Sequence, residues 1–279
     1  IAVLHSSLWV GKSISNEIEE SKLLHIANEI GFPLVIKPTD SNLGKGVITN
    51  IKSEEELIKS FNTLKHKHKN FIIEEFINGD EIRVYVVNKK IIAATKRIPA
   101  NVKGNGQHSI KKLIRQKNKI RKLNPNYKNR NIKINAMTSN ILKEQGFSLE
   151  DIPKAGEVVY LNKKSNLSSG GDAIDISNKT PEIVSKTVLK VAKELPGFVQ
   201  FGIDILYDKK TGRCGVLEIN SRPGIGLHVF PSVGTGKDVP KSIIDYYFPK
   251  IPQLKQDSSI NLYYDFDTIM KTLMEGSFQ

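Results

Sequence analysis

The sequence is short of cysteine and of long apolar runs. Its one cysteine, Cys214, cannot form an internal disulfide, which excludes a disulfide-stapled fold. No apolar stretch is long enough to cross a membrane, and the apolar opening, residues 1–4, is too short for a secretory signal. We therefore expect a cytoplasmic protein without a membrane partner.

Acidic and aromatic residues are also scarce. The 29 Asp and Glu residues are outnumbered by 42 Lys and Arg, which gives a formal net charge of +13 and raises the question of nucleic acid binding. The densest basic segment, residues 111–133, contains one aromatic residue, Tyr127. Without aromatic side chains between the cations, bases have no stacking platform. We therefore favour a solvated basic face, or a funnel for a polyanion such as ATP, over nucleic acid binding.

The composition is that of a globular protein, and 279 residues suffice for one large domain or two small ones. Hydrophobic periodicity predicts an α+β chain. The expected strands are residues 1–4, 34–38, 47–51, 71–77, 81–87, 91–97, 157–161, 201–207 and 216–220. The expected helices are residues 17–30, 53–64, 109 onward, 136–145, 181–195, 239–247 and 268–274, and residues 228–236 are expected to form a loop.

The last two expected strands carry a candidate metal site. A short polar turn joins them, which predicts an antiparallel hairpin. Glu218 and Asn220 are two residues apart, so they point to the same side of their strand, and pairing would bring Asp204 close to them. Carboxylate and amide oxygens suit Mg²⁺. The pattern alone equally allows an aspartate that the backbone satisfies at a strand end.

A lysine and a glycine loop form a candidate phosphate site. Lys37 follows three apolar residues in a strand, where an ammonium group needs a partner. Gly44 and Gly46 let backbone N–H groups approach an anion, and Lys45 adds charge. The spacing of a Walker A motif is absent. By itself the pattern favours an ordinary hairpin that follows an edge-strand lysine.

An acidic strand end supplies a candidate adenine site. Glu74, Glu75, Phe76 and Ile77 end a strand where the chain is expected to cross between domains. Main-chain N–H and C=O groups there could read an adenine edge, and Glu81 could bind ribose hydroxyls. The other interpretation is a plain acidic strand end.

Taken in order, these segments resemble the ATP-grasp superfamily, and in particular the ATP-grasp module of cyanophycin synthetase and of bifunctional glutathione synthetases. The resemblance runs from about Glu17 to about Tyr247. It is carried by residues 31–38, 44–47, 75–83, 97–100, 104–110, 166–171 and 218–224.

The resemblance implies an α+β ATP-grasp fold whose two α+β subdomains clamp ATP. The lid is expected at residues 17–77 and the catalytic subdomain at residues 78–249. Residues 1–16 would be the tail of a preceding domain or a linker, and residues 250–279 a carboxyl-terminal tail.

The resemblance also implies an ATP-dependent carboxylate–amine ligase acting on small amino-acid or peptide substrates through an acyl phosphate. Its cofactors would be ATP and Mg²⁺, two ions for which Mn²⁺ can substitute, held by Asp204, Glu218 and Asn220. Lys37 would hold the inner phosphates of ATP. The catalytic candidates are arginines, whose planar groups suit phosphate and carboxylate, although each could instead form a surface ion pair: Arg83, Arg97 and Arg222.

The substrate site would lie at the glycine turn of residues 166–171. The resemblance implies that backbone N–H groups and serine hydroxyls of the turn cradle a carboxylate or an oxyanion. The expected substrate contacts are Asn166, Ser168, Ser169, Gly170, Gly171, His108 and Gly224. His108 and His228 could act as general bases or only as hydrogen-bonding groups.

The chain departs from the superfamily before Lys37. Relatives carry a further ATP-contacting lysine and a helix there, whereas residues 11–16 run directly into residues 17–20, and Lys12 and Lys22 are poor substitutes. We expect either an omitted stretch or ATP binding with one cation fewer. The relatives' preceding substrate domain is mostly absent too, so an additional domain or a homo-oligomer is an expected partner.

Two alternatives stay open. The same fold serves D-alanine–D-alanine-type and carboxylase-type ligases, in which the nucleophile differs. A basic nucleic-acid-binding module with a degenerate site is a third hypothesis, against which the presence of all three expected metal ligands argues.

Overall fold

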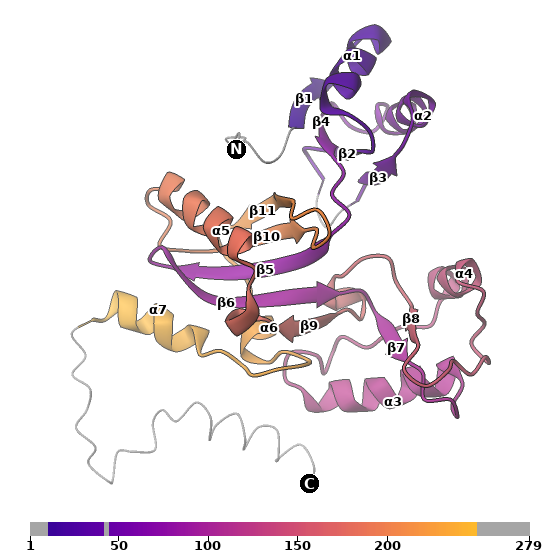
Figure 1. Ribbon diagram of the computed structural model, residues 1–279, viewed down its shortest axis with the longest axis vertical. Coiled ribbons are helices and arrows are strands. Elements are labelled where there is room, and N and C mark those ends of the chain that lie inside the picture. Colours follow the sequence, from indigo (N-terminus) through magenta and orange to yellow (C-terminus); the bar gives the residue numbers. More distant parts are fainter. Residues whose placement is uncertain (1–10, 42–44, 250–279) are drawn as a thin grey trace. The chain divides into compact units, whose positions relative to one another are not determined.

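The computed structural model describes residues 11–41 and 45–249 (Figure 1). The chain divides into two compact units. The first comprises Ile1–Gly79 together with Leu206–Val216, and the second comprises Asp80–Ile205 together with Leu217–Gln279. No helix of the described ranges is long and apolar enough to cross a membrane.

The first unit is an antiparallel sheet with two helices. Its strands are β1 (Gly11–Ser15), β2 (Leu34–Pro38), β3 (Ile48–Ile51) and β4 (Asn70–Glu75), in the order β1-β4-β2-β3. The helices α1 (Glu20–Ile30) and α2 (Glu54–Leu64) bury apolar residues that recur at helical spacing. Ser53 caps α2 by accepting a hydrogen bond from the N–H of Glu56, as the sequence predicted.

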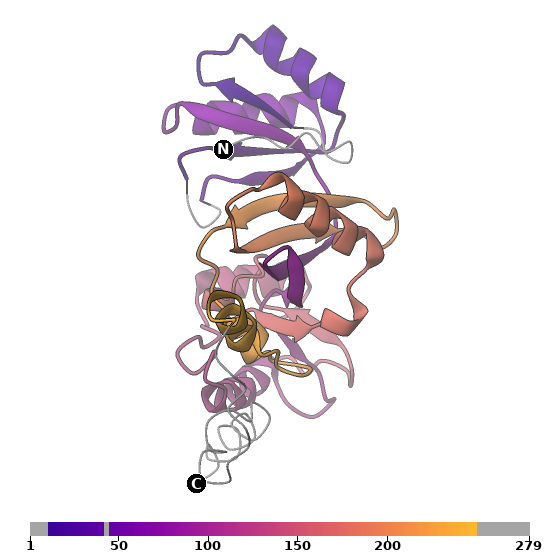
Figure 2. The ribbon, with the colours of Figure 1, turned by 90° about the vertical axis from the view of Figure 1, so that its left-hand side faces the viewer.

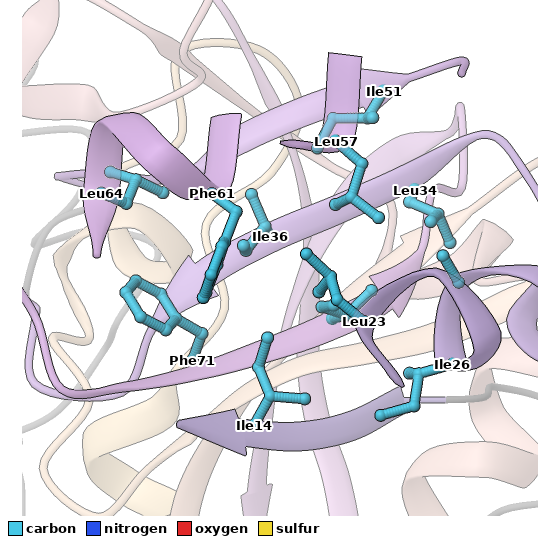
Figure 3. Packing of buried hydrophobic residues seen from close by; sticks show 12 residues of the cluster. Ile14, Leu23, Ile26, Leu34, Ile36, Ile51, Leu57, Phe61, Leu64 and Phe71 are labelled. Carbon is cyan, nitrogen blue, oxygen red and sulfur yellow. The ribbon is translucent and has the colours of Figure 1, made fainter. Parts of the chain in front are cut away.

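The core of the first unit lies between this sheet and its helices (Figure 3). Leu34 and Ile36 alternate with more exposed residues along β2, and both are fully buried. Phe61 of α2 packs edge-to-face on Phe71 of β4, with the ring centroids 5.5 Å apart. Burial of one strand face in this way leaves the opposite face of the sheet for polar side chains.

The second unit contains a five-stranded sheet in the order β11-β10-β5-β6-β9, whose strands are labelled in Figure 1 and seen from another side in Figure 2. Its strands are β5 (Asp80–Val87), β6 (Lys90–Ile98), β9 (Asp172–Asp175), β10 (Gln200–Tyr207) and β11 (Cys214–Asn220), of which residues 206–207 and 214–216 are counted with the first unit. Asn88 and Lys89 both have positive φ, which is the geometry of the tight turn that joins β5 to β6.

The remaining elements of the second unit pack around that sheet. The helices are α3 (Ile110–Leu123), α4 (Ala136–Glu144), α5 (Glu182–Glu194), α6 (Gly226–Val229) and α7 (Val239–Tyr247). A two-stranded antiparallel sheet of β7 (Asn101–Lys103) and β8 (Val158–Tyr160) shares a buried cluster with α3 and α4. Residues of α6 and α7 pack against Tyr85, Val87 and Ala93, on one face of β5 and β6.

The α+β prediction is confirmed, with differences in detail that include two unpredicted strands, β7 and β9. Residues 11–15, expected in a tail or linker, form β1 and pair with β4. The predicted loop at residues 228–236 begins inside the short helix α6. The strand expected at residues 1–4 and the helix expected at residues 268–274 lie outside the described residues.

Candidate functional site

The register of β5 and β6 places four polar residues on one face of the second sheet. Glu81 lies directly opposite Arg97, and Arg83 lies directly opposite Thr95. Residues two apart on a strand share a face, so all four side chains project together. Two arginines, a glutamate and a threonine thereby form the floor of the candidate site.

Asp204 of β10 is the hub of this site. Its side chain is 5% exposed, and it accepts hydrogen bonds from Nε and Nη2 of Arg83, the latter at 2.6 Å. Nη1 of Arg97 lies 3.3 Å from Oδ2 of Asp204 and 2.7 Å from Oε1 of Glu81. Such forked contacts are the strongest ion-pair geometry that proteins use. The predicted metal ligand is thus held by both predicted arginines.

Burial and the surrounding carboxylates have opposite effects on the pKa of Arg83. Burial is the largest single effect and opposes its charged form, but the bond to Asp204 and the charges of Asp204, Glu218 and Glu81 together raise the pKa of Arg83. Arg83 therefore stays protonated although it is largely buried.

Gly202 makes room for this arrangement. A Cβ atom at Gly202 would meet Cβ of Pro223 at 2.6 Å and Cδ of Arg83 at 3.4 Å. Gly202 precedes Asp204 by two residues, so it lies on the same face of β10. The absence of a side chain at this position makes room for Pro223, while Arg83 lies at an ordinary contact distance.

Glu218 and Asn220 are neighbours on β11, as predicted. Nδ2 of Asn220 donates to Oε1 of Glu218 at 2.6 Å, and the Glu218 side chain is exposed. Together with Asp204 they offer two carboxylates and an amide oxygen, a donor set that fits Mg²⁺. The described part of the chain contains no group of three or more His, Cys, Asp and Glu residues arranged for a metal.

A loop that is distant in the sequence also contacts the arginine cluster, which consists of Arg83, Arg97 and their carboxylate partners Asp204 and Glu81. Nη2 of Arg97 donates to Oδ1 of Asn166 at 2.7 Å, and Oγ of Ser165 donates to Oε2 of Glu81. Ser165 is a buried polar residue that sequence reasoning missed. No local signal could have found it, because its partner is 84 residues away in the sequence.

The glycine turn after Asn166 differs from its predicted use. The N–H groups of Ser169, Gly170 and Gly171 donate to carbonyl oxygens of Asn166 and Leu167, so they are not available to cradle an anion. Gly170 has φ +88°, and a Cβ at Gly171 would meet three carbonyl oxygens within 2.9 Å. The glycines serve packing, and the exposed side chains of Ser168 and Ser169 are what the turn presents to solvent.

The two histidines differ in setting. His228 is 1% exposed in α6, its Nδ1 lies 2.6 Å from Oγ1 of Thr95, and its ring packs edge-to-face on Tyr85. Burial, assisted by the charge of Arg83, lowers the pKa of His228 to about 3. The neutral, buried ring of His228 contacts Thr95 and is too enclosed to act as a general base.

His108 closes a turn with Asn105. The backbone N–H of His108 donates to Oδ1 of Asn105 at 2.9 Å.

Arg222 and Gly224 lie beyond the end of β11. Arg222 is exposed and makes no ion pair with any residue of the described ranges. Gly224 has open space where a side chain would be. Arg83 and Arg97, in contrast, share the carboxylate of Asp204.

In the first unit, Lys37 has a carboxylate partner. Its Nζ lies 2.6 Å from Oε1 of Glu74, and the two residues come from neighbouring strands β2 and β4. Burial raises the pKa of the Glu74 carboxyl, while the charge of Lys37 acts against that rise. The predicted strand lysine is thus paired with a predicted nucleotide residue.

The end of β4 offers fewer free groups than expected. Glu75 forms a two-pronged ion pair with Arg213, and the N–H of Phe76 donates to the carbonyl of Pro33 at 2.9 Å. Ile77 follows as a buried side chain. The Phe76 donor is therefore not available to an adenine edge.

The other residues predicted to bind phosphate lie in the glycine loop of residues 44–46, and Lys12 lies on β1. Lys45 is exposed, Gly46 has φ +71°, and Gly44 lies outside the described residues. Lys12, a poor substitute for the relatives' additional lysine, pairs with Glu29. That pairing gives Lys12 a structural partner within the first unit.

Comparison with known proteins defines the class. The family described as D-ala D-ala ligase C-terminus matches residues 7–141. The crystal structure of a bifunctional glutathione synthetase from Pasteurella multocida has a TM-score of 0.66 at 24% identity, over 88% of this chain and 34% of that one. The chain has the fold of the ATP-grasp superfamily.

Within that superfamily the chain is similar to two kinds of enzyme. It is 35% identical over 236 residues to a cyanophycin synthetase of Geminocystis herdmanii, covering 80% of this chain and 26% of that protein. It is 34% identical over 247 residues to the glutathione biosynthesis bifunctional protein GshAB of Clostridium perfringens, covering 85% of this chain and 31% of that protein. The chain therefore spans about a quarter to a third of the length of these curated relatives.

Proposed function

We propose that this chain is the ATP-using part of a carboxylate–amine ligase for small amino-acid or peptide substrates. The observation that carries the proposal is the buried Asp204, held by two arginines on the strand next to the Glu218–Asn220 pair. The names of the relatives, a cyanophycin synthetase and a glutathione biosynthesis protein, support this choice of reaction.

In the proposed reaction, a substrate carboxylate oxygen attacks the γ-phosphorus of ATP and the bond to ADP breaks. An amine then attacks the acyl carbon, and phosphate leaves with the bonding electron pair. Both steps spread negative charge over oxygen atoms, so the residues have to supply fixed positive charge and orientation.

The chain's own residues can meet that demand. Asp204, Glu218 and Asn220 would hold Mg²⁺, which would neutralise charge on phosphate oxygens. Asp204 and Glu81 orient Arg83 and Arg97, which would face the transferring phosphoryl group or the substrate carboxylate.

Residues of the first unit would contact the nucleotide. Lys37 would exchange its bond with Glu74 for one with the inner phosphates, assisted by Lys45 and the backbone at Gly44 and Gly46. Ile77, whose N–H follows the occupied donor of Phe76, would contact adenine.

Ribose and substrate contacts complete the proposal. Glu81 would bind ribose hydroxyls only after releasing Ser165 or Arg97. On the substrate side, Asn166 and the hydroxyls of Ser168 and Ser169 would contact the acyl substrate. Arg222, His108 and Gly224 stay predictions.

The basic segment of residues 111–133 gives little support to nucleic acid binding. Its one aromatic residue, Tyr127, is 1% exposed and lies under the guanidinium of Arg121, 4.6 Å from ring centroid to Cζ. A buried ring cannot stack on a base.

The test is ADP release with Mg²⁺ and ATP, screened across pairs of amino acids and dipeptides. A Glu218→Ala variant should lower turnover by about a hundredfold or more, because it removes a charge that acts on the reacting phosphates. Glu182→Ala is the matched control, since Glu182 is an exposed glutamate of α5 paired only with Lys186. It should leave turnover unchanged.

Two results would contradict the proposal. One is wild-type protein that binds no nucleotide in the presence of Mg²⁺. The other is acid- and amine-dependent ADP release that persists at wild-type rate in Glu218→Ala.

A further inference from the structure

The basic helix α3 does not present all of its cations to solvent. Lys112, Arg115 and Lys119 are exposed, whereas Arg121 is 4% exposed and Lys117 is half-buried. Lys117 and Arg121 are four residues apart, so they lie on the same side of the helix. The inward cations therefore have a separate role from the solvated ones.

Both inward cations converge on Asp172, the first residue of β9. Nζ of Lys117 lies 2.5 Å from Oδ2 of Asp172, and Nη1 of Arg121 lies 2.6 Å from Oδ1. Asp172 itself is 8% exposed. It directly follows Gly171, so this ion-pair cluster lies at the exit of the glycine turn.

Arg121 also holds the turn by its other atoms. Its Nη2 donates to the carbonyl of Gly171 at 3.2 Å and to the carbonyl of Arg130 at 2.8 Å. Its guanidinium covers the Tyr127 ring, which belongs to a buried cluster with Leu167 of the same turn. A planar fork can make these contacts at once, whereas a lysine could satisfy only some of them.

The opposite end of the turn meets the candidate site. Asn166 begins the turn, and its Oδ1 accepts the bond from Nη2 of Arg97. Between the two ends, the N–H groups of Ser169, Gly170 and Gly171 close the turn on itself. A short, internally bonded segment thus joins the Arg121–Asp172 pair to Arg97.

We propose that Arg121 is a positioning residue, which with Asp172 fixes the turn of residues 166–171 and thereby the orientation of Arg97. The geometric part stands on the contacts above. Its consequence for turnover rests on the proposed function. Arg121 does not touch a reacting group, so it acts through Asn166.

The first test measures hydrogen exchange of the amides of Ser169, Gly170 and Gly171 in the full chain. Arg121→Met removes the fork and keeps the apolar stem, so these three amides should exchange about tenfold faster or more. Arg115→Met is the matched control, because Arg115 is an exposed arginine of the same helix, and it should leave the three rates unchanged.

Arg121→Lys is a second control, which separates a local effect on the turn from general destabilisation of the second unit. It retains the charge opposite Asp172 but loses the fork, so exchange in the turn should rise less than in Arg121→Met, with the amides of β5 and β6 unchanged. Unchanged turn amides in both variants, or equal acceleration throughout the second unit, would overturn the positioning role.

The second test separates positioning from mere stability. With the acid–amine pair found by ADP release, Arg121→Met should lower kcat about ten- to a hundredfold, because small misplacement near a reacting centre is costly. The affinity for a non-hydrolysable ATP analogue should not change. Loss of analogue affinity in parallel with kcat would overturn the proposal.

The two proposals fail in different ways. If the wild-type chain releases no ADP with any pair tested, the proposed function fails, while the exchange measurement still decides whether Arg121 fixes the turn.

Discussion

Each unit of the molecule contains a buried cation–carboxylate pair that joins neighbouring strands. Lys37 and Glu74 join β2 to β4 in the first unit, and Arg83 and Asp204 join β5 to β10 in the second. Both carboxylate residues are 4% exposed. The pairs differ in the number of bonds that each carboxylate receives.

Glu74 is paired with the single ammonium of Lys37, and burial still raises the pKa of its carboxyl. Asp204 receives a two-pronged bond from Arg83 and a further contact from Arg97, and the pKa of Arg83 is raised despite burial. The two carboxylates are equally buried but differ in their partners, because a planar fork supplies several directed bonds and a lysine supplies a point charge. The lysine pair is suited to exchange partners, and the arginine cluster is suited to stay fixed.

Removal of the Asp204 charge should have the largest effect. Asp204→Asn keeps the shape of the side chain but removes the carboxylate that Arg83 binds, whereas Arg97 still has Glu81. The Arg83 side chain is only 13% exposed. We expect a loss of about 3–5 kcal/mol in the free energy of unfolding, the usual cost of an uncompensated buried charge. Urea unfolding monitored by circular dichroism measures it.

The control for this variant is Asp245→Asn. Asp245 pairs with Lys241 on the exposed side of α7, and such a helix pair contributes only about 0.5 kcal/mol or less. If Asp204→Asn costs no more than Asp245→Asn, the arginine cluster is not held by Asp204.

Lys37→Met should have a smaller effect that depends on pH. At neutral pH the variant leaves the ionised Glu74 without its lysine, at a cost of about 2–3 kcal/mol. A carboxyl whose pKa is raised by folding destabilises the protein when it is ionised, and protonation relieves that penalty. The cost of Lys37→Met should therefore shrink as the pH falls through the raised pKa of Glu74.

Comparing unfolding at neutral and mildly acidic pH tests this sign. The double variant Lys37→Met with Glu74→Gln should lose most of this pH dependence, because the carboxyl of this pair has been removed. A cost that stays constant with pH would show that Lys37 stabilises the first unit through packing of its stem and not through Glu74.

The same contrast explains what the sequence could predict. Strand and turn patterns predicted the contact of Glu218 with Asn220 and a partner for Lys37, because these depend on strand periodicity and on burial of a cation. The bond of Ser165 to Glu81 and the bond of Arg121 to Asp172 span 84 and 51 residues. Such contacts depend on tertiary packing of loops, which no local pattern specifies.

The glycine turn shows the same limit within a correctly located motif. Its position after Asn166 could be read from Ser168, Ser169 and two glycines, but the use of its amides could not. Those amides close the turn because Gly170 adopts positive φ and Gly171 packs against three carbonyls. A sequence motif thus indicates where the chain turns, while the geometry of the turn decides which donors stay free.

Arg213→Met should have the smallest effect on the free energy of unfolding. It tests the comparison of the two buried pairs with an ion pair that is more exposed to solvent. Arg213 makes a two-pronged contact with Glu75, as Arg83 does with Asp204, but 49% of the Arg213 side chain is exposed. Solvent screens the pair, so we expect a loss of only about 0.5–1 kcal/mol in the free energy of unfolding.

The loss caused by Arg213→Met should nearly vanish at about 1 M salt, where the screening length falls to about 3 Å. Urea unfolding at low and high salt measures it, with Asp204→Asn, whose cost should be insensitive to salt, in parallel. Equal salt sensitivity of the two variants would mean that the fork, and not burial, decides how strongly each pair resists solvent.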